Sequence, residues 1–202
     1  ELADGVSEIA DLPDSFSTRL RISGKCLLEL VLNFAYIFEV FEAEIIAMGD
    51  APENKDNLIE TLQIKAPAQS VPIVCVMDSG IQEEHKYLAP AISSDESISL
   101  LPNNTGTSND VAGEGHGTRV AGAVLYPKKV PSDGVYQLPC WIRNMRILDE
   151  NNCLPENVYP PKTIAIAVQK YNVENQNPTK IFNHSVGSRR SCEMKHMMPW
   201  AA

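Results

Sequence analysis

Residues 73–80 read IVCVMDSG, a run of apolar residues that ends in an aspartate and a tight turn. A continuous apolar run rich in β-branched residues predicts a strand buried on both faces of a parallel sheet. In such sheets, ligands and catalytic groups gather at the carboxyl ends of the strands. Asp78 is therefore a candidate site residue. The alternative is that its carboxylate only caps the turn by accepting backbone hydrogen bonds.

Downstream of this strand, the sequence alternates between predicted helices and strands. Helices are predicted at 117–125 and 163–171, strands at 145–148 and 180–183, and a polar loop at 93–115. Strand, helix, strand, helix, strand in that order predicts an α/β fold with a mainly parallel sheet between helical layers.

Residues 1–70 lack the alternation of strands and helices seen downstream. They are predicted to form a separate N-terminal segment that is small and either α/β or irregular. Within it we expect a strand at 27–32, a helix at 36–48, a weaker helix at 57–64 and a proline-containing linker at 65–72. The second domain is predicted to span residues 71–202.

A second candidate is His116, which stands in the sequence GHGTRVAG at residues 115–122. Glycines on both sides let the backbone approach closely, and the small residues after them favour a helix deep in a core. A structural histidine is the alternative. Together, Asp78 and His116 provide a carboxylate that orients an imidazole as general base for a hydroxyl nucleophile.

Three motifs resemble those of the subtilases, the subtilisin-like serine proteases. VMDSGI at 76–81 resembles their catalytic-Asp motif, and HGTRVAG at 116–122 resembles their catalytic-His motif. IFNHSVG at 181–187 is similar to the strand that lines their substrate cleft, and MRILD at 145–149 to a core strand. The resemblance covers residues 71–190, in the chain order Asp then His of subtilisin.

The resemblance implies a subtilisin-like three-layer fold and a serine endopeptidase acting through an acyl-enzyme. It implies that Asp78 and His116 are catalytic, and that Ser185, Val186 and Gly187 bind the backbone of a polypeptide substrate. By analogy, residues 1–70 are expected to resemble a propeptide, which aids folding and occupies the cleft. Arg119 and His184 depart from the usual residues of the family, but neither belongs to the expected proton relay.

The nucleophile is missing, because no Gly-Thr-Ser-x-Ala motif occurs in the sequence. Ser185 lacks the glycine two positions before it that a nucleophile elbow requires, since Asn183 stands there. We therefore expect the chain to be the front part of a peptidase domain, truncated at its C-terminus and inactive alone. The alternative is a pseudoprotease that binds peptides without catalysis.

Composition excludes several other classes of protein. A net charge of −9 argues against nucleic acid as a partner. The apolar stretch 27–48 contains four glutamates, which argues against a membrane span. Five scattered cysteines without a CxxC pair favour reduced thiols, hence a cytoplasmic location, and make a zinc site improbable.

No metal or cofactor is expected. The acidic loop residues Asp95, Glu96, Asp110 and Glu114 offer calcium ligands, but without the spacing of an EF-hand. We also expect the truncated chain to self-associate, because a parallel sheet without its later strands exposes apolar edges and faces.

Overall fold

A computed structural model of the chain describes residues 5–6, 9–11, 15–40, 46–47, 62–108, 115–156 and 158–188. Its centre is a four-stranded sheet in the order β11-β7-β10-β8, in which every pairing is parallel. The strands are β7 (Ile73–Asp78), β8 (Ile98–Ser99), β10 (Trp141–Arg146) and β11 (Ile181–His184). The predicted parallel sheet is confirmed.

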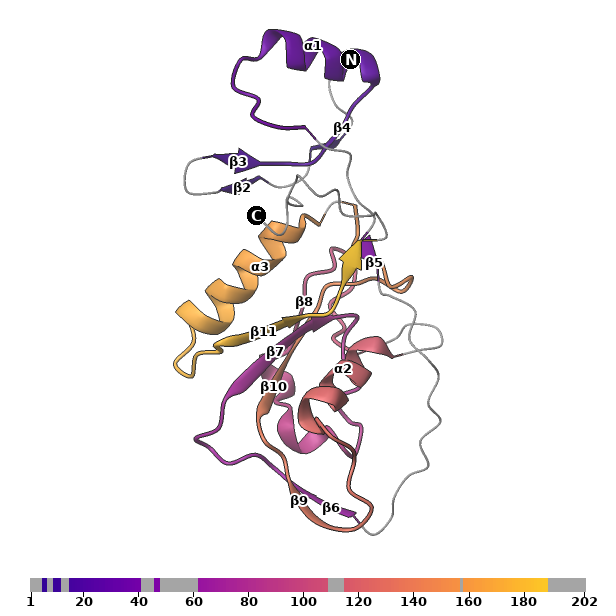
Figure 1. Cartoon of the computed structure of the whole chain (residues 1–202), viewed down its shortest axis with the longest axis vertical. Helices are drawn as coiled ribbons and strands as arrows, with labels where there is room; N and C mark the ends of the chain where they lie inside the picture. The colour runs from indigo at the N-terminus through magenta and orange to yellow at the C-terminus, as the bar shows by residue number, and fades with distance from the viewer. Residues whose placement is uncertain are drawn as a thin grey trace.

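Helices lie on both faces of this sheet, which gives three layers (Figure 1). Helix α2 (His116–Leu125) covers one face. Helix α3 (Pro160–Val168) covers the other and continues into the single π-helical turn η3 (Gln169–Val173). The predicted three-layer α/β fold is therefore confirmed.

The residues of β7 alternate between the two helical layers. Val76 lies with Leu125 in one buried cluster, and Met77 lies with Tyr171 in the other. Side chains two apart on a strand share a face, so Asp78 points to the same side as Val76, toward α2. The alternation thus decides which helix can bring a partner to the carboxylate.

The other elements are short, and most belong to two-stranded sheets. Strand β6 (Leu62–Lys65) pairs in parallel with β9 (Gly134–Gln137), whereas the remaining pairs are antiparallel. These are β1 (Gly5–Val6) with β4 (Leu20–Arg21), β2 (Ala10–Asp11) with β3 (Phe16–Ser17), and β5 (Ile46–Ala47) with β12 (Gly187–Ser188). Helix α1 (Gly24–Asn33) and the 3-10 turns η1 (Ala89–Ala91) and η2 (Ser94–Glu96) complete the described chain.

Three predictions for the N-terminal segment were wrong. The strand expected at 27–32 lies within α1, where Ser23 caps the helix by accepting a hydrogen bond from the Cys26 amide at 3.2 Å. Of the helix expected at 36–48, residues 36–40 are not helical and 46–47 form β5; the rest lies outside the described residues. Four of the five residues at 36–40 are aromatic or β-branched, which disfavours a helix there. Of the helix expected at 57–64, residues 62–64 belong to β6, and 57–61 lie outside the described residues.

The prediction for residues 71–202 also differs from the structure in places. The loop expected at 93–115 contains η2 and β8, and two boundaries lie elsewhere. The strand expected at 145–148 runs from Trp141 to Arg146, because buried polar residues conceal its first half in the sequence. The helix expected at 163–171 begins at Pro160, where a proline suits the first helical position. The expected linker shares Lys65 with β6, and residues 66–72 form no helix or strand.

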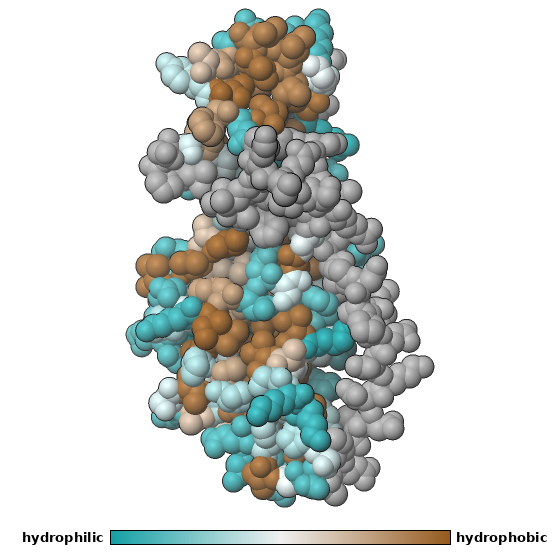
Figure 2. Space-filling view, in the orientation of Figure 1, coloured by the Kyte–Doolittle hydropathy of each residue, from teal (hydrophilic) through white to brown (hydrophobic). Residues whose placement is uncertain are grey.

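Apolar side chains gather on the surface over α1 (Figure 2). No residue of α1 is buried, and Leu28, Leu32 and Phe38 are among the exposed large apolar side chains. Patches of this kind favour association. No helix in the described part of the chain is long and apolar enough to span a bilayer.

We propose that the free chain self-associates, in part through this surface. Sedimentation velocity is expected to show species larger than the monomer, and replacing Leu32 and Phe38 together by Glu is expected to shift the distribution toward the monomer. A sharp monomer peak for the unchanged chain at the same concentration would contradict the proposal.

Candidate functional site

Asp78 is the last residue of β7, and its side chain is 1% exposed. One carboxylate oxygen, Oδ1, accepts hydrogen bonds from the Ser79 amide at 2.7 Å and from the Ser79 hydroxyl at 3.1 Å. A buried carboxylate is tolerated only when such donors compensate for its lost hydration. The turn after the strand therefore both buries Asp78 and fixes its direction.

His116 is the first residue of α2 and lies directly against this carboxylate. Its Nδ1 atom is 2.9 Å from both Oδ1 and Oδ2 of Asp78, and the imidazole side chain is 15% exposed. An ionised carboxylate only accepts hydrogen bonds, so Nδ1 is the donor in this contact, and the neutral tautomer that makes it has its lone pair on Nε2. The structure thus brings the two predicted residues together.

The close approach of α2 to the Asp78 turn depends on Gly117. A β-carbon at this position would lie 2.2 Å from the Gly80 carbonyl oxygen and 3.1 Å from the Asp78 β-carbon. Because glycine has no β-carbon, its backbone can come close enough for the Gly117 amide to donate to the Ser79 hydroxyl at 3.2 Å. This bond satisfies one of the free amides at the helix start.

Replacing Gly117 by Ala is therefore expected to separate His116 from Asp78 and to destabilise the fold by about 1–3 kcal/mol through overpacking. Gly122→Ala, in the same helix, is the matched control, because a β-carbon there meets nothing within 4 Å. The control is expected to be neutral or stabilising by up to about 1 kcal/mol, since Ala favours helix. Urea unfolding measures both. Equal effects of the two substitutions would show that the close approach at Gly117 is unimportant.

The predicted substrate-binding residues lie at the end of β11, the strand beside β7. The Ser185 hydroxyl donates to the Asn183 side-chain oxygen at 2.8 Å, and Val186 is buried in the cluster on the α3 side. Gly187 begins β12, which pairs antiparallel with β5. The backbone after Ser185 is therefore already paired with an extended segment of the N-terminal part of the chain.

Cys75 is a poor candidate for a nucleophile of this site, although it lies on β7. Burial raises the pKa of its thiol to about 12, which the nearby Arg143 guanidinium offsets only in part. A thiol with such a pKa stays protonated at neutral pH and is unreactive. Cys26, Cys75, Cys140 and Cys153 carry no disulfide in the described part of the chain.

His184 ends β11 and is held in its neutral form. Burial lowers the pKa of its imidazole, and the Asp78 carboxylate opposes this in part. A lowered pKa means that the unfolded chain takes up this proton first as the pH falls through the ordinary histidine pKa of about 6.5. The folded state is therefore expected to lose stability from that pH downward, until the lowered pKa is reached.

Replacing His184 by Gln should reduce the loss of stability between pH 7 and pH 5, as measured by urea unfolding at several pH values. His85→Gln serves as the control, since that side chain belongs to a different part of the fold. An unchanged pH dependence in the His184 variant would contradict the assignment.

The sequence analysis missed the polar residues that surround the Asp78 turn. Ser79 was read only as part of a turn, yet its hydroxyl contacts both Asp78 and Gly117. Asn144 and Arg146, buried on β10, were not singled out. Both are polar residues within an otherwise apolar stretch of sequence, which could have marked them as buried polar side chains. The face of the sheet that they occupy is known only from the strand register.

No group of three or more His, Cys, Asp or Glu side chains among the described residues is arranged to hold a metal ion. The acidic loop residues considered for calcium divide between two regions. Asp95 accepts a hydrogen bond from Ser93, and Glu96 pairs with Arg143. Asp110 and Glu114 lie outside the described residues.

The profile of the subtilase family matches residues 69–200. No curated protein matches the chain. The matched range contains all three motifs, at 76–81, 116–122 and 181–187, and the fold around them has the layers that the resemblance implied. The chain therefore belongs to the subtilase family and has a function of the serine-protease type.

Proposed function

We propose that this chain carries the proton relay of a serine endopeptidase, with Asp78 orienting His116 and His116 acting as general acid and base. The observation that supports this most strongly is the buried contact of 2.9 Å between His116 Nδ1 and the Asp78 carboxylate. A base oriented by a third group is the arrangement that activates a hydroxyl nucleophile.

In the proposed mechanism, His116 Nε2 takes the proton of a serine hydroxyl as its oxygen attacks the carbonyl carbon of the scissile peptide. His116 then gives this proton to the leaving amine, which yields an acyl-enzyme. A water molecule then attacks the acyl carbon while the same nitrogen takes its proton, and His116 returns this proton to the serine oxygen as the acid product leaves. Asp78 keeps its negative charge throughout and stabilises the imidazolium that forms in each half-reaction.

We further propose that the nucleophile and the oxyanion donor lie outside these 202 residues. The sequence has no Gly-Thr-Ser-x-Ala motif, and the Ser185 hydroxyl is engaged with the Asn183 side chain at 2.8 Å. Base and nucleophile act as a unit, so the 202-residue chain alone is expected not to hydrolyse peptides.

The proposed substrate contacts are made by residues 185–187 through backbone pairing, the mode called β-augmentation. The antiparallel pairing of β12 with β5 supports this, because it shows that the backbone here accepts an extended partner. The same pairing is consistent with the propeptide-like role proposed for residues 1–70.

Polar contacts also link the N-terminal segment to the peptidase part. The Tyr159 hydroxyl donates to the Ser17 hydroxyl at 2.7 Å, and the Arg19 guanidinium donates to the Glu156 carbonyl at 2.9 Å. Both contacts lie just before the start of α3. The pairings of β5 with β12 and of β6 with β9 attach the segment at two further places. These contacts support a segment that folds against the peptidase part rather than apart from it.

Peptide hydrolysis tests the proposal. The gene product that extends beyond Ala202 is expected to cleave unstructured polypeptides and to be blocked by serine-directed inhibitors, whereas the 202-residue chain should be inactive. Binding of peptides without hydrolysis by the longer product would favour the pseudoprotease instead.

A further inference from the structure

Strand β10 carries two arginines that are almost completely buried, Arg143 and Arg146, at 1% and 0% exposure. Being three residues apart on a strand, they point to opposite faces of the sheet. Arg146 is in register with Asp78 on the neighbouring strand and shares its face, toward α2. Burying a guanidinium costs free energy unless its hydrogen-bond donors are satisfied. The groups that accept these hydrogen bonds therefore indicate which part of the fold the arginine fixes.

The partners of Arg146 lie largely in the loop of residues 106–108. Its Nη1 donates to the carbonyl oxygen of Gly106 at 3.2 Å and to that of Ser108 at 2.9 Å. Asn144, two residues earlier on the same face, donates to the carbonyl oxygen between them, that of Thr107, at 2.9 Å. Two buried side chains of β10 thus bind three consecutive carbonyl groups of one loop.

This loop is packed against the turn that carries Asp78. The Ile81 amide donates to the Thr107 carbonyl oxygen at 3.2 Å. Gly80 has a φ of +95°, and a β-carbon there would lie 2.4 Å from the Thr107 oxygen and 2.9 Å from the Ser108 oxygen. The turn therefore rests on the loop without room for a methyl group, and movement of the loop would release the turn.

We propose that Arg146 is a positioning residue: through the 106–108 loop, and aided by Asn144, it holds the Asp78 turn where the carboxylate meets His116. This inference rests on the proposed function of the Asp78–His116 pair. The chain of contacts runs from Arg146 and Asn144 to the loop carbonyls, from these to Gly80 and Ile81, and so to Asp78.

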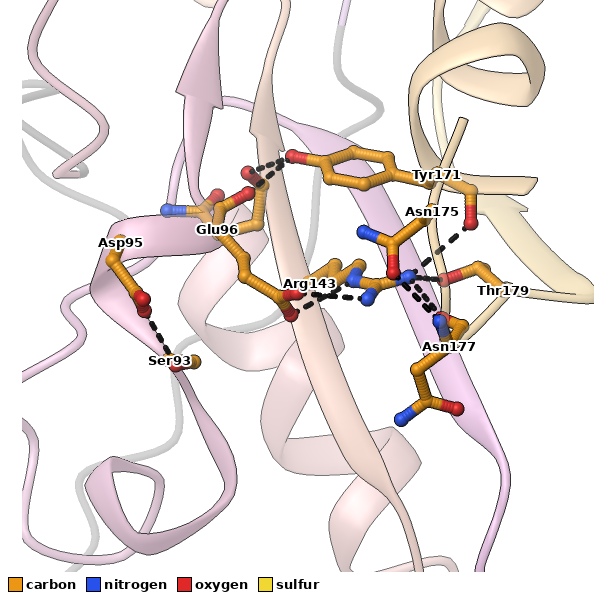
Figure 3. Close-up of polar contacts among 9 residues, drawn as sticks. Ser93, Asp95, Glu96, Arg143, Tyr171, Asn175, Asn177 and Thr179 are labelled. Atoms are coloured by element: carbon orange, nitrogen blue, oxygen red, sulfur yellow. Dashed lines mark hydrogen bonds and ion pairs between the residues drawn. The ribbon is translucent and has the colours of Figure 1, made fainter. Parts of the chain in front are cut away.

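Arg143 provides the internal comparison. Its hydrogen-bond partners among the described residues lie on the opposite side of the sheet: the Glu96 carboxylate, the carbonyl oxygens of Tyr171 and Asn177, and the Thr179 hydroxyl (Figure 3). It is as buried as Arg146 and on the same strand, yet none of these partners belongs to the Asp78 turn. Its removal should lower stability without moving Asp78.

The experiment records the low-field proton NMR resonance of the His116 Nδ1–H group in the 202-residue chain, assigned by its absence in His116→Ala. A charge-assisted hydrogen bond to a buried carboxylate produces this signal, and a merely stable fold does not. Arg146→Met and Arg143→Met are compared at a temperature at which circular dichroism shows both to be folded. Loss of the resonance in Arg146→Met, with retention in Arg143→Met, is the expected result.

Retention of the resonance in folded Arg146→Met overturns the inference, as does its loss in both variants, which would indicate a general effect of destabilisation. If Arg146→Met does not fold, the inference is tested with Arg146→Lys and Arg143→Lys instead. The rate of hydrogen exchange of the Ile81 amide is then compared between these two variants. We expect exchange at least about tenfold faster in Arg146→Lys only, and equal rates overturn the inference. Absence of the resonance in the unchanged chain would instead refute the Asp78–His116 pair itself, and the proposed function with it.

Discussion

Replacing Asp78 by Asn is expected to lower the kcat of the nucleophile-bearing peptidase about 10⁴-fold, while the fold is retained. The amide has nearly the shape of the carboxylate, but its NH₂ group would donate to His116 Nδ1, which now has to accept. The hydrogen then moves to Nε2, and the imidazole can no longer take the proton of the nucleophile. Steady-state hydrolysis of a peptide substrate measures the effect.

Asp95→Asn is the matched control for this substitution. Asp95 is solvated and bonded to Ser93, and the hydrogen bond from the Ser93 hydroxyl lowers the pKa of its carboxyl group. Its replacement should leave kcat unchanged. A folded Asp78→Asn enzyme with kcat within about tenfold of the unchanged protein would rule out the orienting role.

Replacing Glu96 by Ala is expected to destabilise the fold by about 2–4 kcal/mol, the largest stability effect that we predict for a residue outside the Asp78–His116 pair. Its carboxylate forms a two-pronged ion pair with Arg143, at 3.0 Å to Nε and 2.9 Å to Nη2 (Figure 3). Without it, a guanidinium side chain that is 1% exposed keeps its charge but loses its counter-ion. Because the Glu96 side chain is 36% exposed, solvent screens part of the effect, and the estimate stays below that for a fully buried pair.

Glu156→Ala is the control, since the Glu156 carboxylate also pairs with an arginine, Arg21, but its side chain is 85% exposed. Exposed pairs contribute at most about 1 kcal/mol. Thermal and urea unfolding of the two variants are to be compared under the same conditions. Similar losses of stability would mean that the burial of Arg143 is not what makes its ion pair important.

Local signals made much of the fold and the candidate site predictable. Asp78 follows an apolar run whose composition already specifies a buried strand, and His116 stands before the small residues of a core helix. Alternation of side chains then places Asp78 on the face that α2 covers. Each of these inferences depends on residues close together in the chain, where sequence patterns carry most information.

The strand predicted at 27–32 was wrong for a local reason: the cap at Ser23 and the helix-forming leucines favour α1. Other parts could not be predicted because they depend on tertiary contacts. The strand β10 was recognised only in part, because Arg143 and Arg146 look like surface residues until their partners on opposite faces are known. The partners named above are 28 to 47 residues away in sequence, so no local pattern indicates them.

Labelling with a fluorophosphonate probe tests the central claim most directly. A protein that contains this chain together with the proposed nucleophile-bearing part is treated with the probe, and the labelled residue is mapped by mass spectrometry, with His116→Ala as control. Labelling of one serine outside residues 1–202, lost in the His116 variant, is the result that we predict. Absence of labelling in well-folded protein, or labelling that persists without His116, would contradict the assignment of Asp78 and His116 to a serine-protease relay.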